Sequence, residues 1–251
     1  MDLVLTWLTD PAQWRGPDAI PARVLEHLLY SGAAVLLAAV VAVPAGLWVG
    51  HTGRGRVLVV NTAGTLRAIP SLGLLFVSVL VLGPRLQGDA AFLAPALLVL
   101  AVLAVPPIMA GAYAGVAQVD AAARDAARGM GMTGREVLLR VEVPCALPLM
   151  FSGLRSAALQ VVATATLAAT VGLGGLGRFL IDGLTVRDYG QMAGGAIVVA
   201  VLALLVDGLV AVLQRLVVSR GLTTRERRRP RSVTSAATLD RDVAARPTTS
   251  V

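Results

Sequence analysis

The sequence predicts an all-α protein embedded in a membrane, with five membrane-spanning helices. Of its 251 residues, 56% are hydrophobic and only 15% are charged. A soluble domain of this length carries roughly a quarter charged residues, so the deficit of charge indicates a bilayer environment. Long apolar runs, each near the roughly 20 residues that cross a bilayer as a helix, support the same prediction.

The apolar runs divide into five candidate spans. The second is the least regular, because Asn61, Arg67 and Pro70 interrupt it. Its upstream half is too short to cross a bilayer alone, so one kinked span is expected rather than two. The five expected spans are Leu28–Val49, Val57–Leu82, Phe92–Val116, Leu147–Val171 and Ala193–Val218.

The arginines predict the orientation in the cytoplasmic membrane. With the N-terminus outside and the C-terminus inside, most of them fall on the cytoplasmic side of the spans, as the positive-inside rule requires. Residues 1–27 contain Trp7 and Trp14 and are expected at the outer interface, where tryptophan is favoured. Residues 28–218 form the transmembrane domain. Residues 219–251 are expected to be a disordered tail, whose arginines serve as a topology anchor or contact anionic lipid heads.

A polar segment between the third and fourth spans, residues 119–144, has an ordered pattern and is expected in the cytoplasm. Gly129–Gly131 supplies a glycine that can take the left-handed conformation that ends a helix. Thr133 and Glu136 have the spacing of a capping box, so a second helix starts there, and Pro144 limits how far it runs. The first helix has one apolar face, made by Val119, Ala122, Ala123, Ala126, Ala127 and Met130.

This segment contains Asp-Ala-Ala at 125–127, three residues, Gly131, nine residues, and Val-Glu-Val-Pro at 141–144. The spacing resembles the EAA signature of the integral subunits of bacterial ATP-binding-cassette (ABC) importers, which reads Glu-Ala-Ala, three residues, Gly, nine residues, Ile-x-Leu-Pro. Asp125 is shorter than the signature's Glu, and the two Val replacements keep apolarity. The alternative is an ordinary amphipathic surface loop. The resemblance implies a coupling helix that docks on an ATPase subunit, formed by Asp125, Ala126, Ala127, Gly131, Val141 and Pro144.

The resemblance extends over roughly residues 20–218. The stretches Glu26–Gly55, Asn61–Phe76 and Ala163–Leu184 look like permeases of the glycine betaine, carnitine and choline uptake branch. It implies the MetI-like fold of type I importers, with two permeases, two ATPases and an extracytoplasmic substrate-binding protein. ATP and Mg²⁺ would then act on the partner ATPase, and no cofactor is expected in this chain.

Several polar residues lie within the expected spans and need partners there, because an unpaired charge is costly in a bilayer. Asp207 is expected to pair with Arg67 or Arg155, a structural role preferred over substrate contact. The glycine-rich turn of residues 172–177 is expected to be an outer gate or receptor contact. Hydroxyl groups in a helix bond equally well to their own backbone. The candidates for a polar translocation path are Asn61, Arg67, Ser71, Gln160, Thr164 and Asp207.

Enzyme and metal chemistry find no support in the sequence. His27 and His51 stand near opposite ends of the first span and cannot form one metal site. The absence of lysine removes P-loop and Schiff-base chemistry. Much of the net charge of +7 comes from the tail, so nucleic-acid binding is not expected. No catalytic residue and no metal ligand are assigned.

Two functions remain open from the sequence. The first is the permease subunit of an ATP-driven importer of an osmoprotectant, a quaternary amine such as glycine betaine, carnitine or choline. The second is a secondary transporter driven by an ion gradient, with Asp207 or Arg67 as the coupling site. Five spans with one ordered cytoplasmic element argue against the matched inverted repeats of the second class. The exact substrate, and whether two identical or two related permeases assemble, are not encoded in these patterns.

Overall fold

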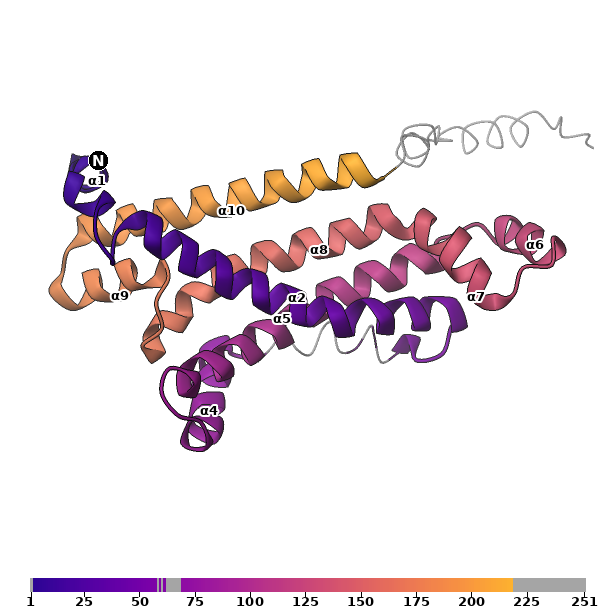
Figure 1. Cartoon of the computed structure of the whole chain (residues 1–251), viewed down its shortest axis with the longest axis horizontal. Coiled ribbons are helices and arrows are strands. Elements are labelled where there is room, and N and C mark those ends of the chain that lie inside the picture. The colour runs from indigo at the N-terminus through magenta and orange to yellow at the C-terminus, as the bar shows by residue number, and fades with distance from the viewer. Residues whose placement is uncertain (1, 58, 60, 62–68, 219–251) are drawn as a thin grey trace, which may run out of the picture. The chain divides into compact units, whose positions relative to one another are not determined.

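The structure is a computed structural model that describes residues 2–57, 59, 61 and 69–218. The predicted tail, residues 219–251, and Arg67 lie outside the described residues. Every regular element within the described residues is helical (Figure 1). The elements are α1 (Asp2–Thr9), η1 (Pro11–Trp14), α2 (Ile20–Thr52), α4 (Ser71–Leu82), η2 (Gly83–Arg85), α5 (Ala90–Ala117), α6 (Ala121–Gly129), α7 (Gly134–Val137), η3 (Leu138–Glu142), α8 (Val143–Ala165), η4 (Thr166–Val171), α9 (Gly177–Val186) and α10 (Tyr189–Val217).

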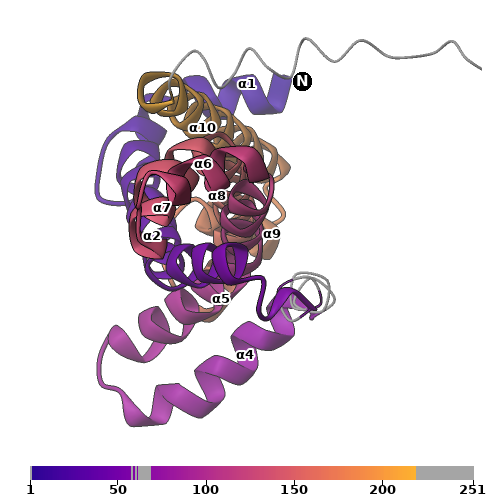
Figure 2. The ribbon, with the colours of Figure 1, turned by 90° about the vertical axis from the view of Figure 1, so that its right-hand side faces the viewer.

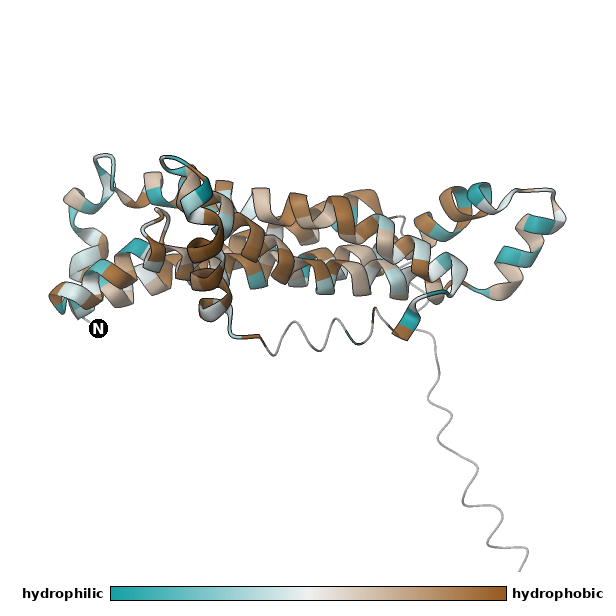
Figure 3. Cartoon of the chain, turned by 90° about the horizontal axis from the view of Figure 1, so that it is seen from below, coloured by the Kyte–Doolittle hydropathy of each residue, from teal (hydrophilic) through white to brown (hydrophobic). Residues whose placement is uncertain are grey.

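Four helical stretches are long and apolar enough to cross a membrane: α2, α5, the run from α7 to η4, and α10. They correspond to the first, third, fourth and fifth expected spans. Figure 3 shows hydrophobic residues over the middle of the bundle and hydrophilic residues gathered at its two ends, which is the pattern of a protein that crosses a bilayer. One end carries α6 and α7 and is called the α6 end. The other carries α1 and α9 and is called the α9 end.

The second expected span differs from the other four. The described part of it contains α4, whose 12 residues from Ser71 to Leu82 are fewer than a bilayer crossing needs. The upstream half lies mostly outside the described residues. Figure 2 shows α4 and the start of α5 leaving the bundle together. Leu75 is the one residue of α4 that is fully buried, and about half of this apolar helix is exposed, including Leu72, Phe76, Val77, Leu80 and Val81.

The first span is longer than predicted. It begins at Ile20 rather than Leu28, because Pro21 occupies the first helical turn, where its missing N–H is not needed. It ends at Gly53, which takes φ of 70° as a left-handed cap. The boundary expected between the N-terminal segment and the transmembrane domain, at residue 27, therefore falls inside α2. The elements that precede α2 are α1 and η1.

The centre of the bundle is made by α2, α5 and α8, which meet through very small side chains. A Cβ on Gly46 would stand 2.7 Å from the Cβ of Ala112, and a Cβ on Gly111 would stand 2.9 Å from the Cα of Gly153. Lipid tails are as apolar as these helices, so close backbone packing rather than water exclusion drives the association. The same core is filled mainly by alanines, including Ala34, Ala38, Ala42, Ala104, Ala157 and Ala165.

The α9 end is closed by α1. The Trp7 indole inserts between α9 and α10, with its ring 5.2 Å from the Phe179 ring in an edge-to-face arrangement. A Cβ on Gly194 would overlap the Trp7 ring, so only glycine admits the indole there. Trp14 Nε1 donates to the carbonyl of Leu8 at 2.8 Å, which folds η1 back on α1. The N-terminal segment is therefore packed onto the bundle rather than lying apart from it.

The crossing of α5 and α8 yields a test of this packing. Gly153→Ala places a methyl group 2.5 Å from the carbonyl oxygen of Pro107, so we expect a loss of about 1–3 kcal/mol of stability, the usual range for an overpacked core. Gly208→Ala is the matched control, because a Cβ there meets nothing within 4 Å and alanine favours a helix. Thermal unfolding of the purified variants in detergent measures both. Equal melting temperatures for the two variants would contradict the close approach of α5 and α8.

Candidate functional site

The predicted helix–turn–helix at residues 119–144 is present at the α6 end. The Asp120 side chain caps α6 by accepting from the Ala122 N–H at 3.0 Å. Gly131 then reverses the chain with φ of 83°, a conformation that side chains with a Cβ rarely adopt. The Thr133 and Glu136 pair forms both halves of a capping box at the start of α7. The helix, the glycine turn and the capped second helix are therefore confirmed.

Pro144 does not end the second helix, contrary to the expectation from the sequence. After α7 the chain passes through η3, a five-residue π turn, and continues into α8 without a break. Pro144 lies in the first turn of α8, where a backbone donor is not required. In the π turn the Val143 N–H bonds to the carbonyl of Leu138, five residues back. As a result, the element after Gly131 continues directly into the fourth span as one helical run.

The exposed face of this element holds most of the residues that the signature singles out. Asp125, Ala126, Gly131 and Pro144 are exposed, and Val141 is half-buried. Ala127 alone within α6 is buried, and it anchors the helix. The predicted apolar face is thus mostly open rather than covered. Its exposed members are Ala122, Ala123, Ala126 and Met130, the last with 73% of its surface accessible.

A buried acid lies at the base of the element and was missed from the sequence. Glu142, 1% exposed, places Oε2 2.6 Å from His51 Nδ1 at the end of α2. Its Oε1 lies 2.7 Å from Arg124 Nε on α6. The Arg124 guanidinium also donates to the carbonyl of Val116 near the end of α5. We call these three side chains the polar joint. The one feature of the sequence that could have indicated this buried acid is that Glu142 stands between two valines, at the unspecified position (x) of the Ile-x-Leu-Pro part of the signature.

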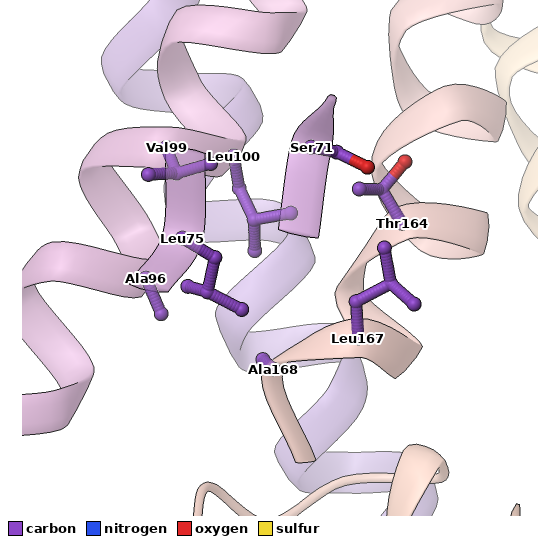
Figure 4. A pocket seen from close by; sticks show the side chains of 8 residues that line it. All are labelled: Ser71, Leu75, Ala96, Val99, Leu100, Thr164, Leu167 and Ala168. Carbon is purple, nitrogen blue, oxygen red and sulfur yellow. The ribbon is translucent and has the colours of Figure 1, made fainter. Parts of the chain in front are cut away.

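Two of the predicted path residues meet in a small crevice between α4, α5 and the end of α8 (Figure 4). The Ser71 hydroxyl points toward the Thr164 side chain across it. Thr164 donates to the carbonyl of Gln160 at 2.7 Å, so its oxygen lone pairs remain for the crevice. The other lining residues are aliphatic: Leu75, Ala96, Val99, Leu100, Leu167 and Ala168.

Among the described residues, the other path candidates do not line this crevice. The Gln160 amide donates to the carbonyl of Leu103 at 3.3 Å and ties α8 to α5. Asn61 is helical, lies upstream of α4 and is exposed. Arg67 is outside the described residues. Asp207 pairs with Arg155 through both carboxylate oxygens, which joins α8 to α10. This confirms one of the two pairings expected for Asp207 and supports its structural role.

The glycine-rich turn at residues 172–177 is fixed against the start of α2. Glu26 Oε2 accepts from the Gly175 N–H at 2.7 Å, and His27 Nδ1 accepts from the Leu176 N–H at 3.3 Å. His27 Nε2 then donates to the carbonyl of Val162 at 2.9 Å, which defines its tautomer. His27 and His51 stand at opposite ends of α2, as expected, and among the described residues no group of acids, histidines or cysteines gathers as a metal site would require.

The comparison with protein families decides the identity. The model of the family described as binding-protein-dependent transport system inner membrane component matches residues 42–220. The chain belongs to this family. Its members are the permease subunits of ABC importers, so the resemblance stated from the EAA-type spacing is confirmed, and the secondary-transporter alternative is not favoured. Such permeases are transport components rather than enzymes, in agreement with the prediction, and they work with ATPase and substrate-binding partners.

Individual relatives agree with the family. The permease is 34% identical over 199 residues to the glycine betaine/carnitine/choline transport system permease protein OpuCB of Bacillus subtilis, covering 78% of this chain and 88% of that protein. It is 30% identical over 203 residues to the osmoprotectant import permease protein OsmW of Salmonella typhimurium, covering 81% and 94%.

The solved structure of the MetNI methionine ABC transporter, in an inward-facing conformation, contains a similar chain. The TM-score is 0.71 at 21% identity, over 84% of this permease and 100% of that chain. This similarity confirms the all-helical importer fold.

The pair between Arg155 and Asp207 gives a second test. Asp207→Ala leaves the Arg155 charge without its partner inside a span, so we expect a clear fall in the melting temperature and in the amount of permease in the membrane. The double variant Arg155→Met and Asp207→Leu removes both charges and is expected to recover most of the loss. Thermal unfolding and membrane yield measure both. An Asp207→Ala permease as stable as the parent would show that the pair does not hold α10 against α8.

Proposed function

We propose that this permease belongs to an importer of a quaternary-amine osmoprotectant, such as glycine betaine, carnitine or choline. The observation that carries the proposal is the sequence similarity of this chain to permeases named for these substrates, over nearly the whole length of those permeases. None of the eight described residues that line the crevice is aromatic. Quaternary amines are usually held by aromatic rings through cation–π contact, so a substrate that passes this crevice is bound only weakly. Selectivity then resides in the substrate-binding protein.

We infer that the α6 end is cytoplasmic and that residues 119–144 are the element that receives the ATPase. The support is its form: an exposed face of small residues, a glycine turn, and a second helix continuous with the fourth span. Small side chains admit the close approach of a partner surface, and Asp125 offers a charge at its edge. ATP binding and hydrolysis, with Mg²⁺, take place on the partner, and the rigid run from α7 to η4 conveys the movement.

We further propose five spans, with the N-terminus outside, and a second permease beside the first. The second of these spans is the one expected over Val57–Leu82, of which the structure describes α4. The side chain of Arg155 is 43% exposed near the middle of α8, where lipid would be an unfavourable neighbour. The outward apolar face of α4 likewise lacks a covering element among the described residues. A second permease, identical or related, would cover such surfaces, and the crevice with Ser71 and Thr164 would line part of the path.

The substrate class is tested by uptake. Proteoliposomes that contain the permease, its ATPase and its binding protein are expected to accumulate radiolabelled choline, glycine betaine or carnitine only when ATP is enclosed on the ATPase side. An ionophore that abolishes ion gradients should leave this uptake unchanged. Uptake that ignores ATP but stops with the ionophore would overturn the proposal in favour of gradient-driven transport.

The docking role is tested at the glycine turn. Gly131→Pro cannot adopt φ of 83° and lacks the N–H that bonds to the carbonyl of Arg128 at 2.9 Å, so the turn is lost. We expect ATP-dependent uptake to fall at least about tenfold, within the usual range of coupling between sites. Gly129→Ala is the matched control, since it is helical and a Cβ there meets nothing within 4 Å. Wild-type uptake by a membrane-inserted Gly131→Pro permease would refute the docking assignment.

A further inference from the structure

We propose that Glu142 is a positioning residue that passes movement of α6 to the spans, and that the polar joint of His51, Arg124 and Glu142 thereby sets how much substrate is moved per ATP. This inference rests on the proposed function. It goes beyond the docking face, because none of these three residues belongs to the exposed surface of α6 that would meet an ATPase.

The burial of Glu142 makes its two contacts necessary. The carboxylate is 1% exposed, and each oxygen faces a different partner, His51 at 2.6 Å and Arg124 at 2.7 Å. A buried carboxylate is stable only when its charge is matched and its oxygens are occupied. The three side chains are therefore expected to move together, since separating either His51 or Arg124 from Glu142 leaves one oxygen of the buried carboxylate without its partner.

The joint brings together four elements that are separate along the chain. Arg124 comes from α6 and also bonds to the carbonyl of Val116 near the end of α5. Glu142 is the last residue of the π turn that leads into α8. His51 is in the last turn of α2, and its Nε2 lies 3.6 Å from where a Cβ on Gly134 would stand, at the start of α7. The end of α2 and the start of α8 thus meet at one carboxylate, and the end of α5 is joined to it through Arg124.

Other connections between α6 and the spans are few. Ala127 is its one buried residue, and its other ion pair, Arg128 with Asp125 at 3.8 Å, stays within the helix. The chain leaves α6 through Gly131, which links it to α7 without a shared helix axis. A displacement of α6 therefore reaches α8 and α2 most directly through Arg124 and Glu142. The link to α2 matters most, because α2 is not adjacent to α6 in the sequence.

The first experiment measures whether the joint fixes α6 to α2. Spin labels are placed on cysteines substituted for Thr52 and Arg128, both exposed, in the full-length permease with Cys145→Ala. We expect a narrow distance distribution in the parent and a clearly broader one with Glu142→Gln, which removes the charge but keeps the shape. An unchanged width would overturn the proposal. Asp182→Asn, a similar change in the partly exposed pair with Arg178 on α9, should leave the width as in the parent.

The second experiment measures coupling in proteoliposomes that contain the complete importer. Glu142→Gln is expected to retain the ATPase subunit and to hydrolyse ATP, yet to move about tenfold less choline or glycine betaine per ATP, an effect typical of a lost coupling interaction. A merely structural role would lower uptake and hydrolysis together and leave their ratio unchanged, and that result would overturn the proposal. Asp182→Asn should keep the parent ratio.

His51→Gln keeps the proposal testable if Glu142→Gln does not fold. It removes one partner of Glu142 and leaves the pair of Glu142 with Arg124. We therefore expect the same broadening of the spin-label distance distribution and a smaller fall in the amount of substrate moved per ATP. The double variant His51→Gln and Glu142→Gln should be no worse than Glu142→Gln alone, because both changes break the same joint. Additive losses would contradict a shared joint. If the parent complex shows no ATP-dependent uptake at all, the proposed function fails, while the spin-label distances still decide whether the joint holds α6.

Discussion

The close contact of α2, α5 and α8 at glycine and alanine is the constraint on which the other features depend. In a bilayer these helices gain little from hiding apolar surface, and dispersion contacts between backbones hold them together. Gly111 and Gly153 allow α5 and α8 to touch, and Gly46 allows α2 to reach α5. With α5 held between its two neighbours, the polar joint forms near its C-terminal end, and the crevice opens beside its N-terminal half. Both features of functional interest are therefore located by the same two crossings.

Several polar side chains in the bundle have defined partners that link neighbouring helices. His27 bridges the carbonyl of Val162 and the N–H of Leu176, and Gln160 bonds to the carbonyl of Leu103. Arg155 and Asp207 neutralise each other between α8 and α10. Each bond links helices that the chain does not connect directly, so it adds alignment that apolar contacts alone do not give. Each end of the bundle contains a carboxylate that contacts another element. Glu26 accepts from the Gly175 N–H at the α9 end, and Glu142 lies against His51 Nδ1 at the α6 end.

Much of the local structure followed from patterns that span a few residues. The capping box of Thr133 with Glu136, the glycine turn and the long apolar helices were all predicted, because each depends on spacing within one or two helical turns. Predictions about where helices stop were less accurate. Pro144 was expected to limit a helix that in fact continues through a π turn, and α2 began earlier than its apolar run suggested. Helix ends respond to capping geometry and to packed neighbours, which hydropathy does not contain.

The sequence by itself determined that this chain is a helical membrane protein and that residues 119–144 form a helix, a glycine turn and a capped second helix. Composition, period and motif spacing are properties of short stretches, so they are readable without a fold. Only the tertiary structure decided which residues meet: Asp207 with Arg155, Ser71 with Thr164, and Glu142 with both Arg124 and His51. Those choices depend on the crossing and rotation of helices about each other, which are set by contacts between residues far apart in the chain.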